Sequence, residues 1–141
     1  TRWTGDWSSD VCSSDLFSRI YNEKIQVSDV SHLVQPIIVP EEINHSYWRY
    51  LITLDPSINR EVIKEELAKD NIASDWAYYP ALHLQPYFMQ QYKTYKGLCP
   101  VAEDSLERNI CLPINSIMQQ EDAVFIVEKF IVAIKKSLCI K

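Results

Sequence analysis

The chain of 141 residues, with 47% hydrophobic and 23% charged residues, has the size and composition of one ordinary globular domain. Its net charge of -5 offers no basic surface for nucleic acid or anionic lipid, and its two glycines, Gly5 and Gly97, exclude a glycine-rich phosphate-binding loop. No apolar run approaches the roughly 20 residues of a membrane span and no signal peptide is evident, so we expect a cytoplasmic protein without membrane association.

The cysteines and histidines are too widely spaced to predict a disulfide framework or a metal site. No Cys-x-x-Cys, His-Glu-x-x-His or comparable zinc-binding spacing occurs. A chain of this length builds its core without disulfides, so we expect free thiols and no bound metal. These residues are Cys12, Cys99, Cys111 and Cys139, together with His32, His45 and His83.

The first sixteen residues lack the helical and strand periodicity of the sequence that follows them. Residues 6–16, DWSSDVCSSDL, can be encoded by a DNA string that resembles a common short-read sequencing adapter. We therefore expect residues 1–16 to be an adapter-derived, non-native tail, joined in frame to a gene fragment whose own coding begins near Phe17. The alternative is an ordinary disordered tail of small polar residues.

The predicted elements begin with a helix over residues 17–25, where apolar residues recur at helical intervals. A connector with Pro36 and Pro40 follows, with one short extended piece at 37–39. The aromatic and branched residues of 47–54 predict a strand. One face of this strand carries Trp48, Tyr50, Ile52 and Leu54.

The middle of the chain predicts a capped helix and a second strand. Asn59 caps a helix over residues 60–69, and residues 70–71 end it. Residues 72–79 are rich in aromatic side chains and predict a strand that stops at Pro80.

The last third of the chain predicts two short helices, a short strand and one long helix. Residues 87–92 form the first short helix, and Pro100 begins the second. Residues 110–112 form the strand. The closing helix has acidic residues near its start and basic residues near its end, and its spacing predicts core positions at Val124, Val127, Ile131 and Ile134. This order of elements predicts an α/β or α+β domain with a small sheet covered on one face by helices.

Three stretches in order resemble the C-terminal small domain of the DegT/DnrJ/StrS family, the sugar-nucleotide aminotransferases that use pyridoxal phosphate (PLP). The first is NHSYWRYLITLD followed by NREVIKEELAKDNI. The second, YYPALHLQPYF, is similar to the family's aromatic-Pro-x-x-His-x-Gln-Pro loop, and its sequence most resembles that of perosamine-synthase-like members. The third, CPVAEDSLERNICLPI, matches the family's Pro-x-Ala-Glu pattern. Together they cover residues 17–141.

The resemblance implies the small domain of a fold-type I aminotransferase, with a small, mainly antiparallel sheet packed against helices. It implies a homodimer that transfers an amino group, from a donor such as glutamate, to a nucleotide-linked keto sugar in polysaccharide or O-antigen biosynthesis. A 4-keto-6-deoxy sugar is the expected class.

In the family, a preceding large domain holds PLP through a lysine Schiff base. We therefore assign no catalytic or cofactor-binding residue within 17–141, and expect the fragment alone to be inactive. Surface positions are expected for Lys24, Lys64, Lys69, Lys93 and Lys96.

Two alternative functions stay open. In the dehydrating members of the same family a histidine replaces the lysine and a sugar hydroxyl is removed, and the deciding residue lies outside this chain. The other interpretation takes the chain as complete and makes it a small acidic binding or regulatory domain without catalysis.

Candidate substrate-contacting residues lie in the loop over residues 79–85, where prolines stiffen the chain beside side chains that can bind sugar hydroxyls. His83, which matches the family's histidine, is the first choice, followed by Tyr79 and Gln85. The alternative is that His83 only holds the loop in place. A structural role is expected for His45, and core positions are expected for Trp48 and Trp76.

Overall fold

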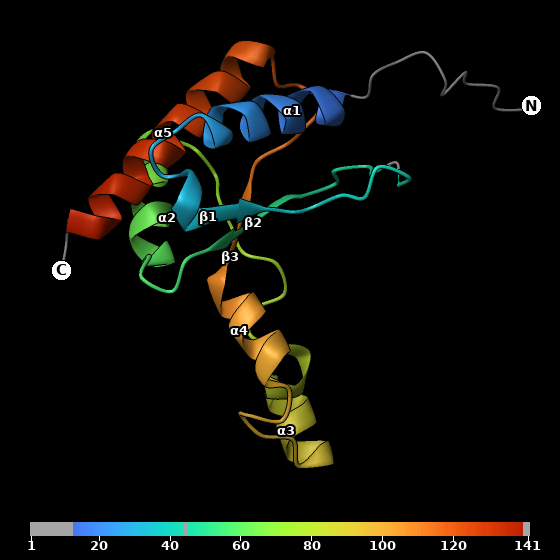
Figure 1. The fold of residues 1–141 in the computed structure, drawn as a ribbon. Coiled ribbons are helices and arrows are strands. Elements are labelled where there is room, and N and C mark those ends of the chain that lie inside the picture. Colours follow the sequence, from blue (N-terminus) through green and yellow to red (C-terminus); the bar gives the residue numbers. More distant parts are fainter. Residues whose placement is uncertain (1–12, 44, 140–141) are drawn as a thin grey trace, which may run out of the picture.

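An antiparallel sheet of three strands forms the centre of the domain, in the order β1-β2-β3 (Figure 1). The computed structural model describes residues 13–43 and 45–139. The strands are β1 (Val34–Pro36), β2 (Tyr50–Leu54) and β3 (Asn109–Leu112). Since β2 pairs on both sides, it is the central strand.

The alternating burial of β2 decides which of its residues meet the helices. Tyr50, Ile52 and Leu54 are buried, and the residues between them are half-buried. Ile52 pairs with Pro36 of β1 and with Ile110 of β3. Proline suits β1 because this strand lies at the sheet edge, where the missing N–H donor does not interrupt a ladder of hydrogen bonds.

Three helices form the second layer: α1 (Ser13–Gln26), α2 (Arg60–Lys69) and α5 (Gln120–Cys139). The long helix α5 packs against both α1 and α2, and Figure 1 shows α1 and α5 side by side. A 3-10 helix, η1 (Ser31–Leu33), leads from α1 into β1. The two layers give the domain one continuous core.

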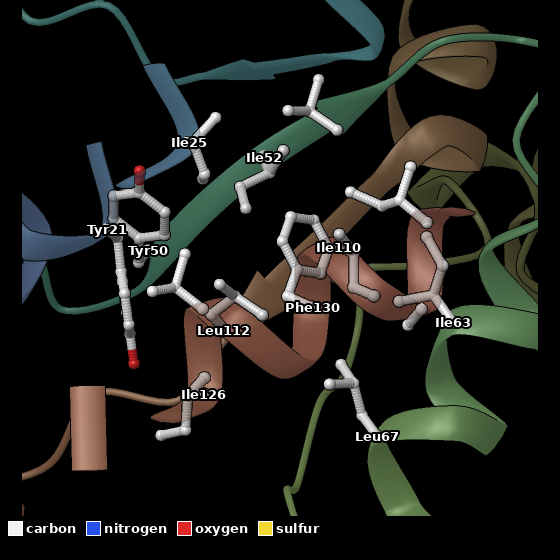
Figure 2. Close-up of a cluster of buried hydrophobic side chains, with 14 of the residues drawn as sticks. Tyr21, Ile25, Tyr50, Ile52, Ile63, Leu67, Ile110, Leu112, Ile126 and Phe130 are labelled. Carbon is white, nitrogen blue, oxygen red and sulfur yellow. The ribbon is translucent and has the colours of Figure 1, made fainter. Parts of the chain in front are cut away.

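The core lies between β2, β3 and the facing sides of the three helices (Figure 2). Its two buried tyrosines have partners for their hydroxyls: Tyr21 donates to the carbonyl of Pro113 at 2.7 Å, and Tyr50 to Oδ1 of Asn22 at 2.5 Å. The centroids of the two rings lie 4.9 Å apart. Both hydroxyls are therefore hydrogen-bonded while the rings pack in the core. The largest fully buried side chains also include Phe130, Ile52, Ile63, Leu67, Ile110 and Leu112.

A separate arm extends away from this core, on the far side of the sheet from α1 and α5 (Figure 1). It consists of the 3-10 helix η2 (Leu82–Leu84), α3 (Pro86–Tyr92) and α4 (Pro100–Arg108). Neither α3 nor α4 buries a residue completely, and α3 contacts η2. Helix α4 continues directly into β3, which joins the arm to the sheet.

Most predicted elements are confirmed, including the α/β class and the mainly antiparallel sheet. Helix α2 spans the predicted residues, and Oδ1 of Asn59 accepts the backbone N–H of Glu61 at 3.0 Å. The short helices, the strand after α4 and the closing helix are also present. Within α5, Val127 and Ile134 are buried as predicted, whereas Val124 and Ile131 are only half-buried.

The sequence placed the first strand wrongly, at 37–39. Strand β1 is Val34–Pro36, because Val34 is the residue that reaches the core opposite Leu54, while Ile38 is exposed. The strand predicted over 47–54 begins only at Tyr50.

The prediction that Trp48 belongs to the core is also wrong, since Trp48 is 70% exposed. The backbone of the residue before it, Tyr47, has a φ of 44°, in the left-handed region, which interrupts the strand alternation before Trp48. Trp76 is half-buried.

Residues 72–79 do not form the predicted strand. They make a single antiparallel bridge, between Asp75 and Cys111. The backbone is left-handed at two residues in or next to this stretch, with φ of 58° at Asn71 and 56° at Tyr78. This conformation is incompatible with a continuous ladder of strand hydrogen bonds. The segment therefore runs as an irregular connection beside β3.

Most of the predicted tail, including Cys12, lies outside the described residues. Its last four residues form the first turn of α1, where the hydroxyl of Ser14 donates to the carbonyl of Ser46 at 3.0 Å. No helix in the described ranges is long and apolar enough to cross a lipid bilayer.

Candidate functional site

The loop predicted to contact substrate lies at the base of the arm, between the sheet and α3. Pro86 occupies the start of α3, where its missing N–H costs no helical bond. Gln85 folds back on the loop, because its Nε2 donates to the carbonyl of Pro80 at 3.1 Å. The structure thus places Gln85 in the closure of the loop.

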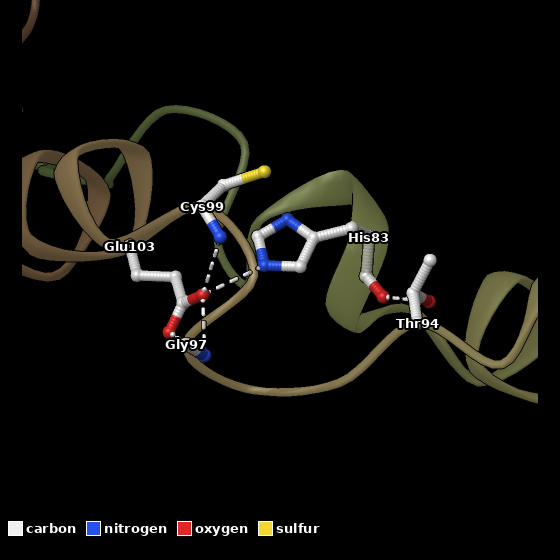
Figure 3. A network of polar contacts seen from close by, with 5 residues as sticks. All are labelled: His83, Thr94, Gly97, Cys99 and Glu103. Atoms are coloured by element: carbon white, nitrogen blue, oxygen red, sulfur yellow. Dashed lines mark hydrogen bonds and ion pairs between the residues drawn. The ribbon is translucent and has the colours of Figure 1, made fainter.

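His83 is held at both its ring and its backbone (Figure 3). Its Nε2 lies 2.8 Å from Oε1 of Glu103, and the two side chains are only 13% and 10% exposed. The carbonyl of His83 accepts the hydroxyl of Thr94 at 2.5 Å. His83 is therefore fastened to the two segments that follow it in the arm, as in the alternative under which it holds the loop.

Glu103, in the first turn of α4, joins η2 to the turn between α3 and α4, which is a role the sequence did not reveal. Its carboxylate accepts the backbone N–H of Gly97 at 2.8 and 3.0 Å and that of Cys99 at 3.2 Å (Figure 3). Gly97 has a φ of 96°, which glycine adopts without strain at this turn. In the sequence, Glu103 was the glutamate of the Pro-x-Ala-Glu pattern and an acidic residue suited to the first turn of α4, and neither signal identified its partners.

The contacts to Glu103 favour its charged form. The hydrogen bond from His83 first, and those from the amides of Gly97 and Cys99 next, hold the pKa of the Glu103 carboxyl below its usual value of 4.5, although partial burial opposes them. Since an ionised carboxylate only accepts hydrogen bonds, Nε2 of His83 must carry the proton between them.

Tyr79 lies apart from this polar cluster and faces a cavity of about 530 Å³ between the start of α2 and α4. Neither His83 nor Gln85 is among the residues that line the cavity. The predicted site residues therefore share one loop but face two different environments. The polar and charged side chains around Tyr79 include Asn59, Arg60, Asp104, Glu107 and Arg108.

His45 has the structural surroundings that the sequence indicated. Its Nδ1 accepts the backbone N–H of Tyr47 at 2.9 Å, and the two rings pack edge to face with centroids 4.6 Å apart. His45 therefore supports the left-handed turn before β2.

The lysines among the described residues are not placed to hold PLP as a Schiff base. A lysine that binds this cofactor needs its amine free within a pocket. Five lysines instead pair with carboxylates, and the Nζ of Lys64 lies 4.1 Å above the ring of Trp76. Lys93 and Lys96 are exposed on the arm. The paired lysines are Lys24, Lys69, Lys129, Lys135 and Lys136.

Metal and thiol chemistry find no support within the described ranges. Residues 13–43 and 45–139 contain no group of three or more His, Cys, Asp or Glu side chains placed to hold a metal ion. Cys99, Cys111 and Cys139 are free thiols, as predicted. Burial raises the pKa of the Cys111 thiol, which makes it a poor nucleophile.

Comparison with known proteins identifies the family. Residues 16–131 match the DegT/DnrJ/EryC1/StrS aminotransferase family. The chain belongs to this family. It is 35% identical over 122 residues to an uncharacterised protein of Methanocaldococcus jannaschii, covering 84% of this chain and 30% of that protein. It is 28% identical over 115 residues to GDP-perosamine synthase of Escherichia coli, covering 82% of this chain and 28% of that protein.

Solved structures of aminotransferases share this fold. PseC of Helicobacter pylori, an aminotransferase involved in the biosynthesis of pseudoaminic acid, matches 88% of this chain and 32% of its own, with a TM-score of 0.76 and 17% identity. The PLP-form of a protein assigned as a sugar aminotransferase from Streptococcus pneumoniae matches 89% of this chain and 31% of its own, with a TM-score of 0.73 and 24% identity. The chain thus spans about a third of the length of these family members.

Proposed function

We propose that this chain is the small domain of a PLP-dependent aminotransferase that transfers an amino group to a keto sugar nucleotide. The match of residues 16–131 to an aminotransferase family carries the proposal. A sugar acceptor is supported by the similarity to GDP-perosamine synthase. We take a 4-keto-6-deoxy sugar as the acceptor, glutamate as the donor, and a homodimer in the cytoplasm as the working form.

The cofactor is assigned to a part of the enzyme outside the described residues. When bound, PLP supplies the carrier chemistry for the amino group. Because the described lysines are ion-paired, stacked on an aromatic ring or exposed on the arm, we assign no chemical step to them, and propose that the 141-residue chain is inactive by itself. We also propose that residues 1–16 are adapter-derived and that residues 17–141 form the native domain.

The contribution of this domain is substrate contact through Tyr79, His83 and Gln85. Nε2 of His83 is engaged by Glu103, and in the neutral imidazole the other ring nitrogen, Nδ1, is a hydrogen-bond acceptor. A sugar hydroxyl is the matching donor. Tyr79 would contact the ligand from the neighbouring cavity, and Gln85 keeps the loop between them closed.

The test uses the enzyme encoded by the complete reading frame that contains residues 17–141. The purified protein with PLP is incubated with glutamate and a set of GDP-linked 4-keto-6-deoxy sugars, and the products are analysed by mass spectrometry. We expect an amino sugar nucleotide and 2-oxoglutarate in equal amounts. A deoxygenated keto sugar that carries no amino group, formed with release of ammonia and 2-oxoglutarate, would identify the dehydratase instead. Absence of both products, in a protein that binds the sugar nucleotide, would favour a non-catalytic binding domain.

A further inference from the structure

Arg60 is a buried cation at a helix end that disfavours positive charge. It is the first residue of α2 and is only 8% exposed. The N-terminus of a helix carries the positive end of the helix dipole, so a cation there is unfavourable unless other contacts compensate. The surroundings of the guanidinium must therefore explain its position.

Two aromatic rings lie against the Arg60 guanidinium. The Cζ atom is 4.4 Å from the ring centroid of Trp76 and 4.2 Å from that of Tyr79. Contacts of this kind are strongest when the cation is shielded from water, and burial provides that condition here. Arg60 thus binds both ends of the segment over residues 76–79.

Hydrogen bonds attach the same guanidinium to the junction of α4 and β3. Nη1 of Arg60 donates to the carbonyl of Leu106 at 2.7 Å and to that of Asn109 at 3.4 Å. The side chain of Asn109 in turn accepts the N–H of Ala77 at 3.0 Å and donates to its carbonyl at 3.4 Å. Arg60 and Asn109 therefore fix the 76–79 segment to the sheet from two sides.

We infer that Arg60 is a positioning residue, which holds the 76–79 segment in place and so determines where Tyr79 faces its cavity. The substrate role of Tyr79 rests on the proposed function, whereas the positioning itself does not. Lysine cannot replace this arginine fully, because an ammonium group lacks the planar surface that stacks between two rings.

The test compares the wild-type chain with Arg60→Met and Arg60→Lys by residue-resolved hydrogen exchange. The reporter is the amide of Ala77, which bonds to Asn109, and the reference amides are those of Val127 and Phe130 in the buried face of α5. Arg60→Met should speed exchange at Ala77 roughly tenfold and leave the reference amides unchanged, with Arg60→Lys between the two. Arg19→Met, an exposed arginine of α1, is the matched control and should change neither.

The outcomes separate positioning from general stability and from function. Equal acceleration of exchange at Ala77 and in α5 would mean that Arg60 only stabilises the whole fold. An unchanged exchange rate at Ala77 would mean that Arg60 does not hold the 76–79 segment. Either result overturns the inference. If Arg60→Met prevents folding, Arg60→Lys provides the same comparison. Since no sugar nucleotide is present, failure of the amino-transfer assay would refute the proposed function without altering this result.

Discussion

Nε2 of His83 lies 2.8 Å from Oε1 of Glu103, and this contact joins residues 20 positions apart in the chain. Glu103 also accepts the amides of Gly97 and Cys99. One carboxylate therefore links η2, in the candidate substrate loop, to the turn before α4 through three residues.

Replacing Glu103 should loosen the arm without unfolding the core. Glu103→Gln keeps the size of the side chain but removes the charge that strengthens its three accepted bonds. We expect hydrogen exchange at the amides of Gly97 and Cys99 to rise by roughly tenfold, because one charge-assisted hydrogen bond has about that effect.

The matched control is Glu107→Gln, which lies on the same helix and is exposed. It should leave the two amides unchanged. Equal protection of Gly97 in wild type and Glu103→Gln would show that the carboxylate does not close the arm.

Acid should loosen the arm through the same group. The pKa of Glu103 is lower in the folded chain than its usual value of 4.5, so its contribution to stability is fully present above that value and is lost as the pH falls through the lower, folded pKa. Limited proteolysis of the arm should therefore accelerate below about pH 4.5 in the wild-type chain.

The difference between wild type and Glu103→Gln isolates this effect, because Asp29, Asp55, Glu66 and Asp104 also titrate at lowered pKa values in both proteins. The variant should lack the part of the acid dependence in the arm that comes from Glu103. Identical pH profiles for the two proteins would exclude Glu103 as the group responsible.

The cap of α2 offers a separate test of helix stability. Asn59→Ala removes the oxygen that accepts the N–H of Glu61 and should lower the free energy of unfolding by about 1 kcal/mol. Asn59→Asp retains an acceptor and should remain near wild type. Urea unfolding measures both, and an unchanged midpoint for Asn59→Ala would mean that the cap does not stabilise the domain.

Two phenylalanines of α5 should differ sharply in their importance. Phe130 is fully buried in the core, so Phe130→Ala should cost about 3–5 kcal/mol. Phe125 is 46% exposed on the same helix, and Phe125→Ala should change stability by less than about 0.5 kcal/mol. If Phe130→Ala fails to fold, Phe130→Leu should still unfold at a lower urea concentration than Phe125→Leu; similar midpoints would contradict the placement of Phe130 in the core.

Local signals were sufficient to predict most helices. The Asn59 cap and the prolines at positions 86 and 100 act on neighbouring residues, so their effects can be read from a short stretch of sequence. The apolar period of α5 also predicts a helix, although Val124 and Ile131 lie at the edge of its buried face.

Contacts between distant residues explain what sequence patterns missed. The segment over 72–79 looked like a strand, yet it makes one bridge to Cys111, and the backbone of Ala77 bonds to the Asn109 side chain, 32 positions away. Glu103 was visible as a helix-start residue and as part of the Pro-x-Ala-Glu pattern, but its contact with His83 was not, since that distance depends on how the arm folds. For the same reason the sequence grouped Tyr79 with His83, although they face different surroundings.

The central claim is that residues 17–141 form the small domain of a larger aminotransferase. Resequencing the source locus through the codon for Phe17, with a method that uses no such adapter, tests this claim most directly. We predict an open reading frame that continues upstream of Phe17, lacks DWSSDVCSSDL and encodes the family's cofactor-binding lysine. A start codon followed by DWSSDVCSSDL in the genomic DNA would contradict the claim and make a non-catalytic binding domain the better account.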